Sequence, residues 1–300
     1  MKLFAEPVVR ATGLFPEGFE LLTTGIGFDG AIFCVARQPN ERQTEQGGVR
    51  DLHVKRWDDG TVRSATISKP PLTPDYVQPL GDGFLLASAR CSHDESGAER
   101  NALVCRETGQ LRASMTLGDG ILDVRTTSED QIWVSYFDEG VLGNCGWGSP
   151  GPAPIGAPGI VRFDRNGRIE FRYDAEAAGT DMICDAYAMN VDEHGTVWTC
   201  FYTEFPIVRI RDGTYQRWEY GRAGASALAV KGQRALMVGD YKRRNALTLV
   251  ELGSDGRARP TDGGKLLTAE GKSLDHARFV GVGSTLYATQ DGVVFQLAEW

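Results

Sequence analysis

The sequence contains no run of apolar residues approaching the ~20 that span a bilayer, which predicts no membrane contact. It also lacks a basic block. Its 32 Lys and Arg against 40 Asp and Glu give a formal charge of −8. An acidic chain whose densest basic cluster is Lys242–Arg244 is a poor binder of phosphate backbones, so no nucleic-acid partner is predicted. The first residues lack the apolar core of a signal peptide, and we expect a cytoplasmic protein.

Several chemical motifs are absent. None of the six cysteines forms a C-x-x-C pair, which makes a zinc ribbon improbable. In a cytoplasmic protein these cysteines are expected to be reduced. The sequence also has no G-x-S-x-G nucleophile elbow, P-loop, Rossmann fingerprint or HExxH motif. Any catalytic site must therefore be assembled from residues distant in the sequence.

Helix-forming residues are scarce, but glycine is abundant. The chain has too few Ala, Leu, Glu and Lys for a helical bundle, while its 37 glycines make up about 12% against a usual ~7%. The aromatic content of 9% and the charged content of 24% exclude a disordered chain. The glycines therefore indicate many tight turns.

Short runs rich in β-branched and aromatic residues recur along the chain, each after a turn signal such as Asp29-Gly30 or His194-Gly195. We predict strands at Ala31–Arg37, Phe84–Arg90, Gln131–Phe137, Thr196–Tyr202, Arg234–Asp240 and Thr285–Asp291.

After five of these strands a second hairpin is expected. Its turns are Asp59-Gly60, Thr108-Gly109, Asn166-Gly167, Asp212-Gly213 and Asp255-Gly256. The repeating unit is therefore four antiparallel strands, which is typical of a β-propeller blade. The repeats predict an all-β, six-bladed β-propeller. A β-sandwich or two small barrels are the alternatives.

The last unit ends early, because Phe295–Trp300 supplies a third strand and no fourth. The segment at about Leu3–Ala11 precedes the first unit and needs a partner. We predict that it completes the last blade as its outer strand and closes the ring, which removes an exposed edge. Residues 1–300 would then form a single propeller domain.

Two blades carry a recognisable pattern. Asp192–Trp198 is followed by Ile207–Gly213, and Gln131–Trp133 by Gly159–Asp164. This resembles the DG-x-[IV]-W … [IV]-x-R-[IF] … DG blade of virginiamycin B lyase-like and NHL/SMP-30-like propellers. The pattern builds blades, so the resemblance implies the fold first. It further implies a divalent ion held by acidic residues near the channel and, for the lyases, a histidine. His276 is the only histidine at the head of a predicted inner strand.

In a propeller the innermost strands begin at one rim of the central channel. Four blades place an aspartate where the inner strand is expected to start: Asp75, Asp123, Asp185 and Asp275. Such residues can simply brace the backbone by accepting hydrogen bonds. As a converging set they would raise one another's pKa values, or bind a cation or a cationic ligand. Asp123, Asp185 and Asp275 are the candidate ligands of Ca or Mg. His276 and Tyr187 could add acid–base or stacking groups.

Two loops on this rim are long. Gln38–Arg50 is polar, and Asp138–Pro158 is rich in glycine and proline with Trp147 near its tip. Long loops in compact domains are often functional, so Trp147 is a candidate ligand-binding residue of a lid over the channel. The alternative is a packing loop that covers a neighbouring blade.

Three hypotheses for function follow. The first is a propeller that binds a small molecule or a protein partner at the acidic rim. The second is a metal-assisted hydrolase or lyase with its site at the same rim, with His276 as the candidate catalytic residue. The third is a pure scaffold, which predicts a channel filled by side chains and no polar pocket.

Overall fold

The computed structural model describes residues 1–39 and 50–300, so most of the polar loop Gln38–Arg50 lies outside the described residues. The described chain is almost entirely β-structure, and its helices are short: η1 (Ala11–Leu14), α1 (Asp138–Leu142) and α2 (Ala175–Ala178). None of the described helices is long and apolar enough to cross a membrane.

Four of the sheets contain four strands each. The first two consist of β2 (Glu20–Ile26), β3 (Ile32–Arg37), β4 (Leu52–Asp58) and β5 (Thr61–Ile67), and of β6 (Tyr76–Leu80), β7 (Gly83–Ala87), β10 (Ala102–Arg106) and β11 (Leu111–Met115). The next two consist of β12 (Ile121–Thr126), β13 (Ile132–Tyr136), β14 (Ile160–Phe163) and β15 (Ile169–Arg172), and of β16 (Asp185–Val191), β17 (Val197–Tyr202), β18 (Ile207–Arg211) and β19 (Thr214–Trp218).

A larger sheet of eight strands follows in the order β20-β21-β22-β23-β1-β26-β25-β24. Its strands are β20 (Ala227–Lys231), β21 (Arg234–Val238), β22 (Ala246–Leu252), β23 (Ala258–Thr268), β1 (Lys2–Arg10), β26 (Val293–Leu297), β25 (Thr285–Gln290) and β24 (Arg278–Val282). A two-stranded arm of β8 (His93–Asp94) and β9 (Gly97–Ala98) projects between β7 and β10.

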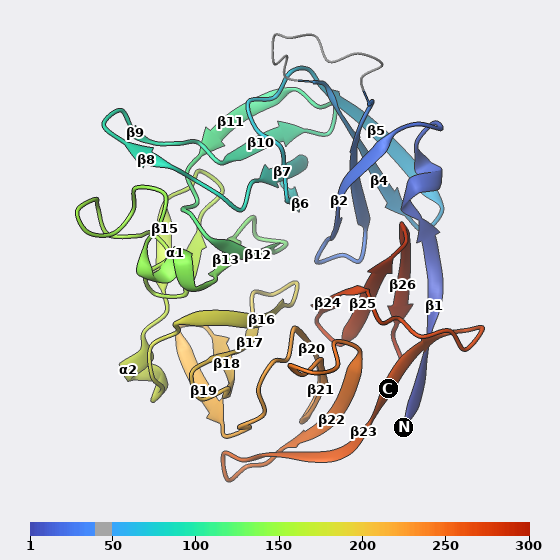
Figure 1. Cartoon of the computed structure of the whole chain (residues 1–300), viewed down its shortest axis with the longest axis vertical. Helices are drawn as coiled ribbons and strands as arrows, with labels where there is room; N and C mark the ends of the chain where they lie inside the picture. The colour runs from blue at the N-terminus through green and yellow to red at the C-terminus, as the bar shows by residue number, and fades with distance from the viewer. Residues whose placement is uncertain (40–49) are drawn as a thin grey trace.

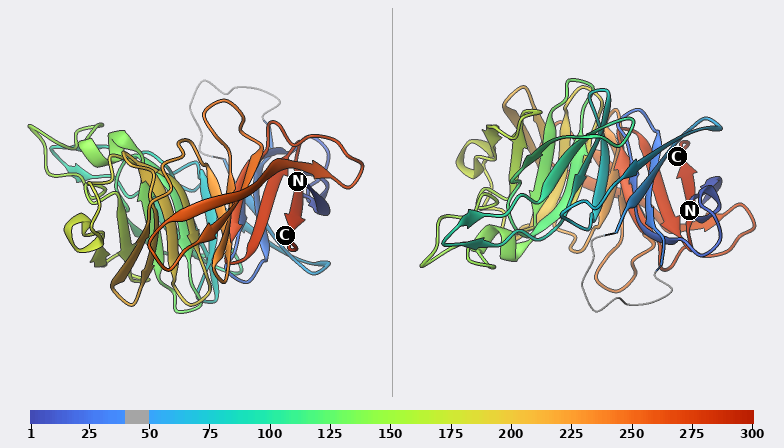
Figure 2. Two further views of the ribbon diagram at one scale, coloured as in Figure 1. Left: turned by 90° about the horizontal axis from the view of Figure 1, so that it is seen from below. Right: turned by 90° about the horizontal axis from the view of Figure 1, so that it is seen from above.

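The sheets stand around a common centre, with β2, β6, β12, β16, β20 and β24 nearest to it (Figure 1). Seen from the side, they lie next to one another along the molecule (Figure 2). All six predicted strand runs coincide with strands, within three residues at either end, and all five predicted second hairpins are present. The prediction of repeated four-stranded antiparallel sheets is therefore confirmed.

The N-terminal strand joins the two halves of the eight-stranded sheet. Its second half pairs antiparallel with β26, from Glu6 opposite Gln296 to Arg10 opposite Val293. This is the pairing predicted for that segment. Its first half pairs parallel with β23, from Lys2 opposite Lys265 to Ala5 opposite Thr268, which was not predicted. Because β23 has 11 residues, it offers a free edge to the first half of β1.

The repeated tryptophan and arginine of the blade pattern lie directly opposite each other on neighbouring strands. Trp133 opposes Arg162, and the guanidinium carbon lies 5.4 Å from the ring centroid. Trp198 and Arg209 repeat the arrangement at 5.7 Å. A cation over an aromatic face is attracted by the ring quadrupole, and the arginine stem covers apolar surface. In these two sheets the pattern therefore corresponds to a cross-strand pair of tryptophan and arginine.

The inner strands are tied together by a buried amide. Asn190 on β16 is fully buried, and its Nδ2 donates to the carbonyl oxygens of Leu228 (2.9 Å) and Gly283 (2.8 Å). Its Oδ1 accepts from the Gly283 backbone N–H at 2.8 Å. One side chain therefore links β16 to β20 and to the turn after β24.

The variant Asn190→Ala should lower the free energy of unfolding by about 3 kcal/mol, because three hydrogen bonds are lost and their backbone partners stay buried. Urea unfolding measures the loss. The matched control Asn166→Ala lies in an exposed turn and should change stability little. Equal effects in the two variants would show that the amide does not brace the inner strands.

Candidate functional site

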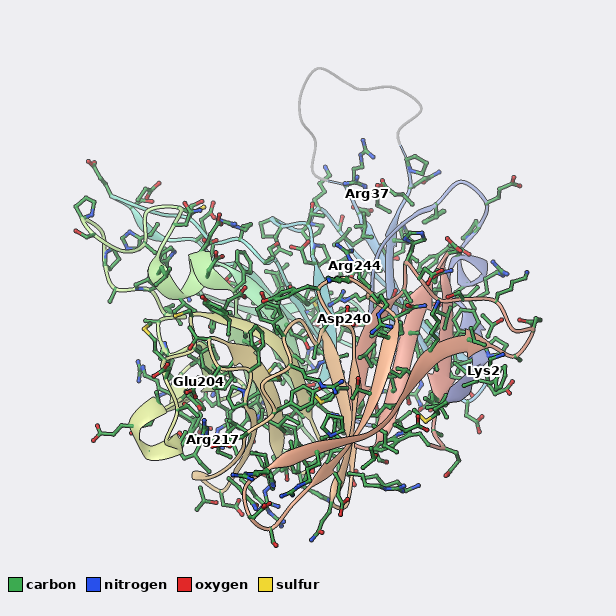
Figure 3. All side chains as sticks on the ribbon, turned by 60° about the horizontal axis from the view of Figure 1, so that its bottom comes forward. Lys2, Arg37, Glu204, Arg217, Asp240 and Arg244 are labelled. Atoms are coloured by element: carbon green, nitrogen blue, oxygen red, sulfur yellow. The ribbon has the colours of Figure 1, made fainter. Side chains whose placement is uncertain are left out.

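A cavity of about 800 Å³ lies where the inner strands begin. Its walls come from β12, β16 and β24, from the segment before β20, and from the loops that follow β13 and β21. Asp240 and Arg244 of the β21–β22 loop lie near the middle of the molecule (Figure 3). A neighbouring cavity of about 480 Å³ continues toward β2 and β6 and shares Leu122, Arg278 and Val280 with the first.

Three inner strands carry a β-bulge close to the start of the strand. The bulged residues, which face no partner in the neighbouring strand, are Leu22, Leu122 and Tyr187. A bulge redirects the side chain of the extra residue, and each of these three lines one of the two cavities. The bulges therefore turn a side chain of the sheet into the channel, and on β16 that side chain is a tyrosine.

Asp185 opens β16 and lines the cavity together with Asp138, the first residue of α1. Burial, and then the negative charge of Asp138, raise the pKa of Asp185 to about 6. Among the described residues the Asp185 carboxylate has no hydrogen bond or ion pair, and no cation offsets these two effects. A carboxyl group in this state is typical of functional sites.

Asp123 also lines the cavity, but its negative charge is balanced by an arginine. Its Oδ2 lies 2.9 Å from Nε of Arg125, and both side chains are largely buried. Arg125 in turn donates to the carbonyl oxygen of Ile26 at 3.4 Å, which ties β12 to β2. Asp123 is therefore part of an internal ion pair.

The other two aspartates act as backbone or side-chain braces. Asp75 accepts from the Ala89 N–H at 2.7 Å and lies at the neighbouring cavity. Asp275 accepts from Asn245 Nδ2 at 2.5 Å and from Ser273 Oγ at 2.7 Å, and it does not line the main cavity. Of the four predicted aspartates, only Asp123 and Asp185 meet in one cavity.

The predicted aspartates do not converge on one point because each lies at a different position relative to the start of its strand. Asp123 is the third residue of β12, Asp185 is the first residue of β16, and Asp275 lies three residues before β24. Among residues 1–39 and 50–300 no three His, Cys, Asp or Glu side chains are grouped so that they could hold a metal ion. The structure therefore does not bring Asp123, Asp185 and Asp275 together as the expected ligands of one Ca or Mg ion.

One wall of the cavity is aromatic. Tyr187 and Tyr241 share a hydrogen bond of 3.1 Å between their hydroxyl oxygens. Both rings contact Phe205 edge to face, with centroid distances of 5.3 and 6.0 Å. Phe205 is buried, whereas Tyr241 is 64% exposed and is held in place by its neighbours. Burial and the hydrogen bond to Tyr241 raise the pKa of Tyr187 above its usual value.

His276 lines the same cavity, as predicted for a residue at the head of an inner strand, and its backbone N–H donates to Gln290 Oε1 at 3.1 Å. His276 thus lines the same cavity as Asp185 and Tyr187. A catalytic role for His276 stays a prediction.

The loop Asp138–Pro158 divides into two parts. Its first residue faces the cavity, but its tip packs on the arm of the neighbouring sheet. Trp147 is buried, donates from Nε1 to the carbonyl oxygen of Cys91 at 2.8 Å, and contacts the ring of His93 edge to face. The structure therefore does not bring Trp147 to the channel, because its indole fills a gap beside β8.

Sequence reasoning missed Asp138, Phe205 and Tyr241. Asp138 could have been found as the first residue of the long loop. Tyr241 follows a strand directly, in a polar loop, where a lone aromatic side chain is unusual. No local signal marks Phe205.

Comparisons with known proteins identify the fold. No protein-family model matches the chain, and no curated protein sequence matches it. A chain of the mitotic checkpoint complex is 11% identical, covers 94% of this chain and 78% of its own, and gives a TM-score of 0.55. YCF48 from Cyanidioschyzon merolae is 11% identical over 94% of this chain and 96% of its own, with a TM-score of 0.51.

A virginiamycin B lyase from Staphylococcus aureus, crystallised with quinupristin, is 10% identical, covers 98% of both chains and has a TM-score of 0.49. Identities this low show the fold alone. The fold is a β-propeller, as the blade pattern predicts.

The electrostatics of Asp185 predict a pH-dependent stability effect. A raised pKa in the folded state means that ionisation is harder there than in the unfolded chain, so stability falls as the pH rises from about 4 through 6. Asp185→Asn removes this cost. Its melting temperature should exceed the wild-type value by about 2–4 °C at pH 7.5 and should match it at pH 3.5.

Thermal unfolding at the two pH values tests this prediction. The control Asp212→Asn replaces a carboxylate that is 88% exposed and should behave alike at both pH values. If Asp185→Asn is less stable than the wild type at pH 7.5, ionised Asp185 does not destabilise the folded state and the prediction is wrong.

Proposed function

We propose that this chain is a six-bladed β-propeller that binds a small molecule in the cavity at the rim of its central channel. The observation that carries the proposal is the cavity of about 800 Å³, in which Asp185, Tyr187, Tyr241 and His276 meet. Small-molecule sites are typically concave, apolar in part, and supplied with a few polar groups. This cavity combines an aromatic wall with a carboxyl group whose pKa is perturbed.

The six-blade count is part of the proposal. Four sheets have four strands, and the eight-stranded sheet divides into β20–β23 and β24–β26 with β1. In this reading β1 is the outer strand of the last blade, and its pairing with β26 closes the ring. Residues 1–300 are then one domain, for which we propose a cytoplasmic location.

The cavity favours this function over a pure scaffold. A scaffold predicts a channel filled by side chains, whereas this channel contains space lined by charged and aromatic groups. Solved chains of similar fold also include protein complexes, such as YCF48 bound to D1 peptide. A cavity with these dimensions suits a compact ligand better than a broad protein surface.

The alternative is a hydrolase or lyase at the same rim. It is supported by the presence of His276 and Asp185 in one cavity, because imidazole and carboxyl groups are common general acids and bases in enzymes. Among the described residues, no three His, Cys, Asp or Glu side chains are grouped so that they could hold a metal ion. The metal-assisted form of this alternative therefore needs further ligands. Elemental analysis of the purified protein tests that form, and a stoichiometric divalent ion would favour it.

A thermal-shift screen of small metabolites on the full chain tests the binding proposal, followed by calorimetry on any compound that stabilises the protein. Tyr241→Ala should weaken binding about tenfold or more, because it removes an exposed wall of the cavity. The matched control Phe4→Ala removes an aromatic ring that is 48% exposed on β1 and should leave affinity unchanged.

Two results would contradict the proposal. One is that no compound in the screen binds. The other is that Tyr241→Ala and Phe4→Ala bind the stabilising compounds as tightly as the wild type does, which would place binding elsewhere.

A further inference from the structure

One side of the cavity is negative and aromatic at the same time. Asp185 and Tyr187 lie two residues apart on β16, and the loops after β13 and β21 bring Asp138 and Tyr241 to the same cavity. Carboxylates and aromatic faces both attract positive charge. The combination differs from an acidic cluster alone because it also presents a fixed, exposed ring.

Among residues 1–39 and 50–300, no arginine or lysine forms an ion pair with the carboxylates of Asp138 or Asp185. Asp138 lies close enough to Asp185 to raise its pKa, and no described arginine or lysine lowers it. Other acidic residues of the cavity are already paired: Asp123 with Arg125, and Asp240 with Arg243 at 3.0 Å. A positive charge on a ligand would therefore relieve the repulsion between Asp138 and Asp185.

The basic residues of the cavity lie on other elements than Asp138 and Asp185 do. Arg125 is held by Asp123, and the guanidinium carbon of Arg278 lies 5.5 Å from the ring centroid of Tyr76. Arg244 lines the cavity from the β21–β22 loop (Figure 3), where its charge opposes the entry of a cation. Removing the charge of Arg244 should therefore strengthen the binding of a cation, whereas removing the charge of Asp185 should weaken it.

The rings of Tyr187 and Tyr241 are held in place by each other and by Phe205. Tyr187 is the bulged residue of β16 and lines the cavity, and its hydroxyl group forms a hydrogen bond with that of Tyr241. Phe205, which supports both rings, holds a positive φ of 51°, a conformation that is uncommon for a bulky residue. Backbone strain of this kind is retained when the surrounding contacts enforce it.

From this arrangement we propose that the ligand is an organic cation, an amine or quaternary ammonium compound, bound between the carboxylates of Asp138 and Asp185 and the rings of Tyr187 and Tyr241. The inference rests on the proposed small-molecule function and names the chemical class of its ligand.

Calorimetry with two pairs of probes tests the ligand class on the full chain. The pairs are choline with its neutral analogue 3,3-dimethylbutan-1-ol, and phenethylamine with 2-phenylethanol. In at least one pair the cation should bind about tenfold or more tightly than the neutral analogue, and added salt should weaken its binding.

Variants then locate the charge. Asp185→Asn should weaken binding of the cation about tenfold, whereas the control Asp212→Asn, an exposed carboxylate at the β18–β19 turn, should not. Arg244→Ala should bind the cation more tightly than the wild type. Tyr241→Phe keeps the ring and should retain most of the affinity that Tyr241→Ala loses.

The outcomes separate the two proposals. If neutral or anionic compounds bind in a Tyr241-dependent way and neither cation binds more tightly than its analogue, the organic cation is excluded while the binding cavity stands. If Asp185→Asn binds the cations as the wild type does, the inference is also overturned. If no compound of any charge binds, both proposals fail.

Discussion

The close approach of the inner strands is the constraint on which the rest of the molecule depends. A Cβ atom added at Gly25 would lie 1.8 Å from the carbonyl oxygen of Val77, and one at Gly281 would lie 1.8 Å from that of Leu228. Neighbouring inner strands therefore touch through their backbones, and the amide of Asn190 satisfies the polar groups where three of them meet. Space for a ligand remains where the strands begin, because bulges and loops set the side chains apart there.

Away from the centre, the same cross-strand contact occurs in three of the described sheets. An arginine on the third strand covers the aromatic residue opposite it on the second, which pairs Trp133 with Arg162 and Trp198 with Arg209. Phe33 and Arg56 repeat this arrangement in the first sheet at 5.5 Å. These arginine–aromatic pairs do not involve the start of the inner strands, so the residues there can differ from sheet to sheet. The candidate site is located there.

Local chemistry explains why most of the fold could be predicted and much of the site could not. An Asp-Gly or Asn-Gly turn is determined by its own residues, so hairpins such as that at Asp212 follow from sequence. The cavity depends on single-residue shifts: a bulge at Tyr187 directs its ring inward, and the late start of β24 removes Asp275 from the set. Such shifts have no sequence signature, and the partners of Trp147, namely Cys91 and His93, come from a distant part of the chain.

The double pairing of β1 has a consequence for how the molecule is assembled. Residues near the N-terminus form backbone hydrogen bonds with both β23 and β26, which are separated from them by most of the chain. Contacts between residues so distant in sequence carry a large entropic cost before they are rewarded, and they slow folding. During synthesis β1 therefore waits for its partners while the first four sheets can already form, and joining β1 to β26 is expected to be the last step of folding.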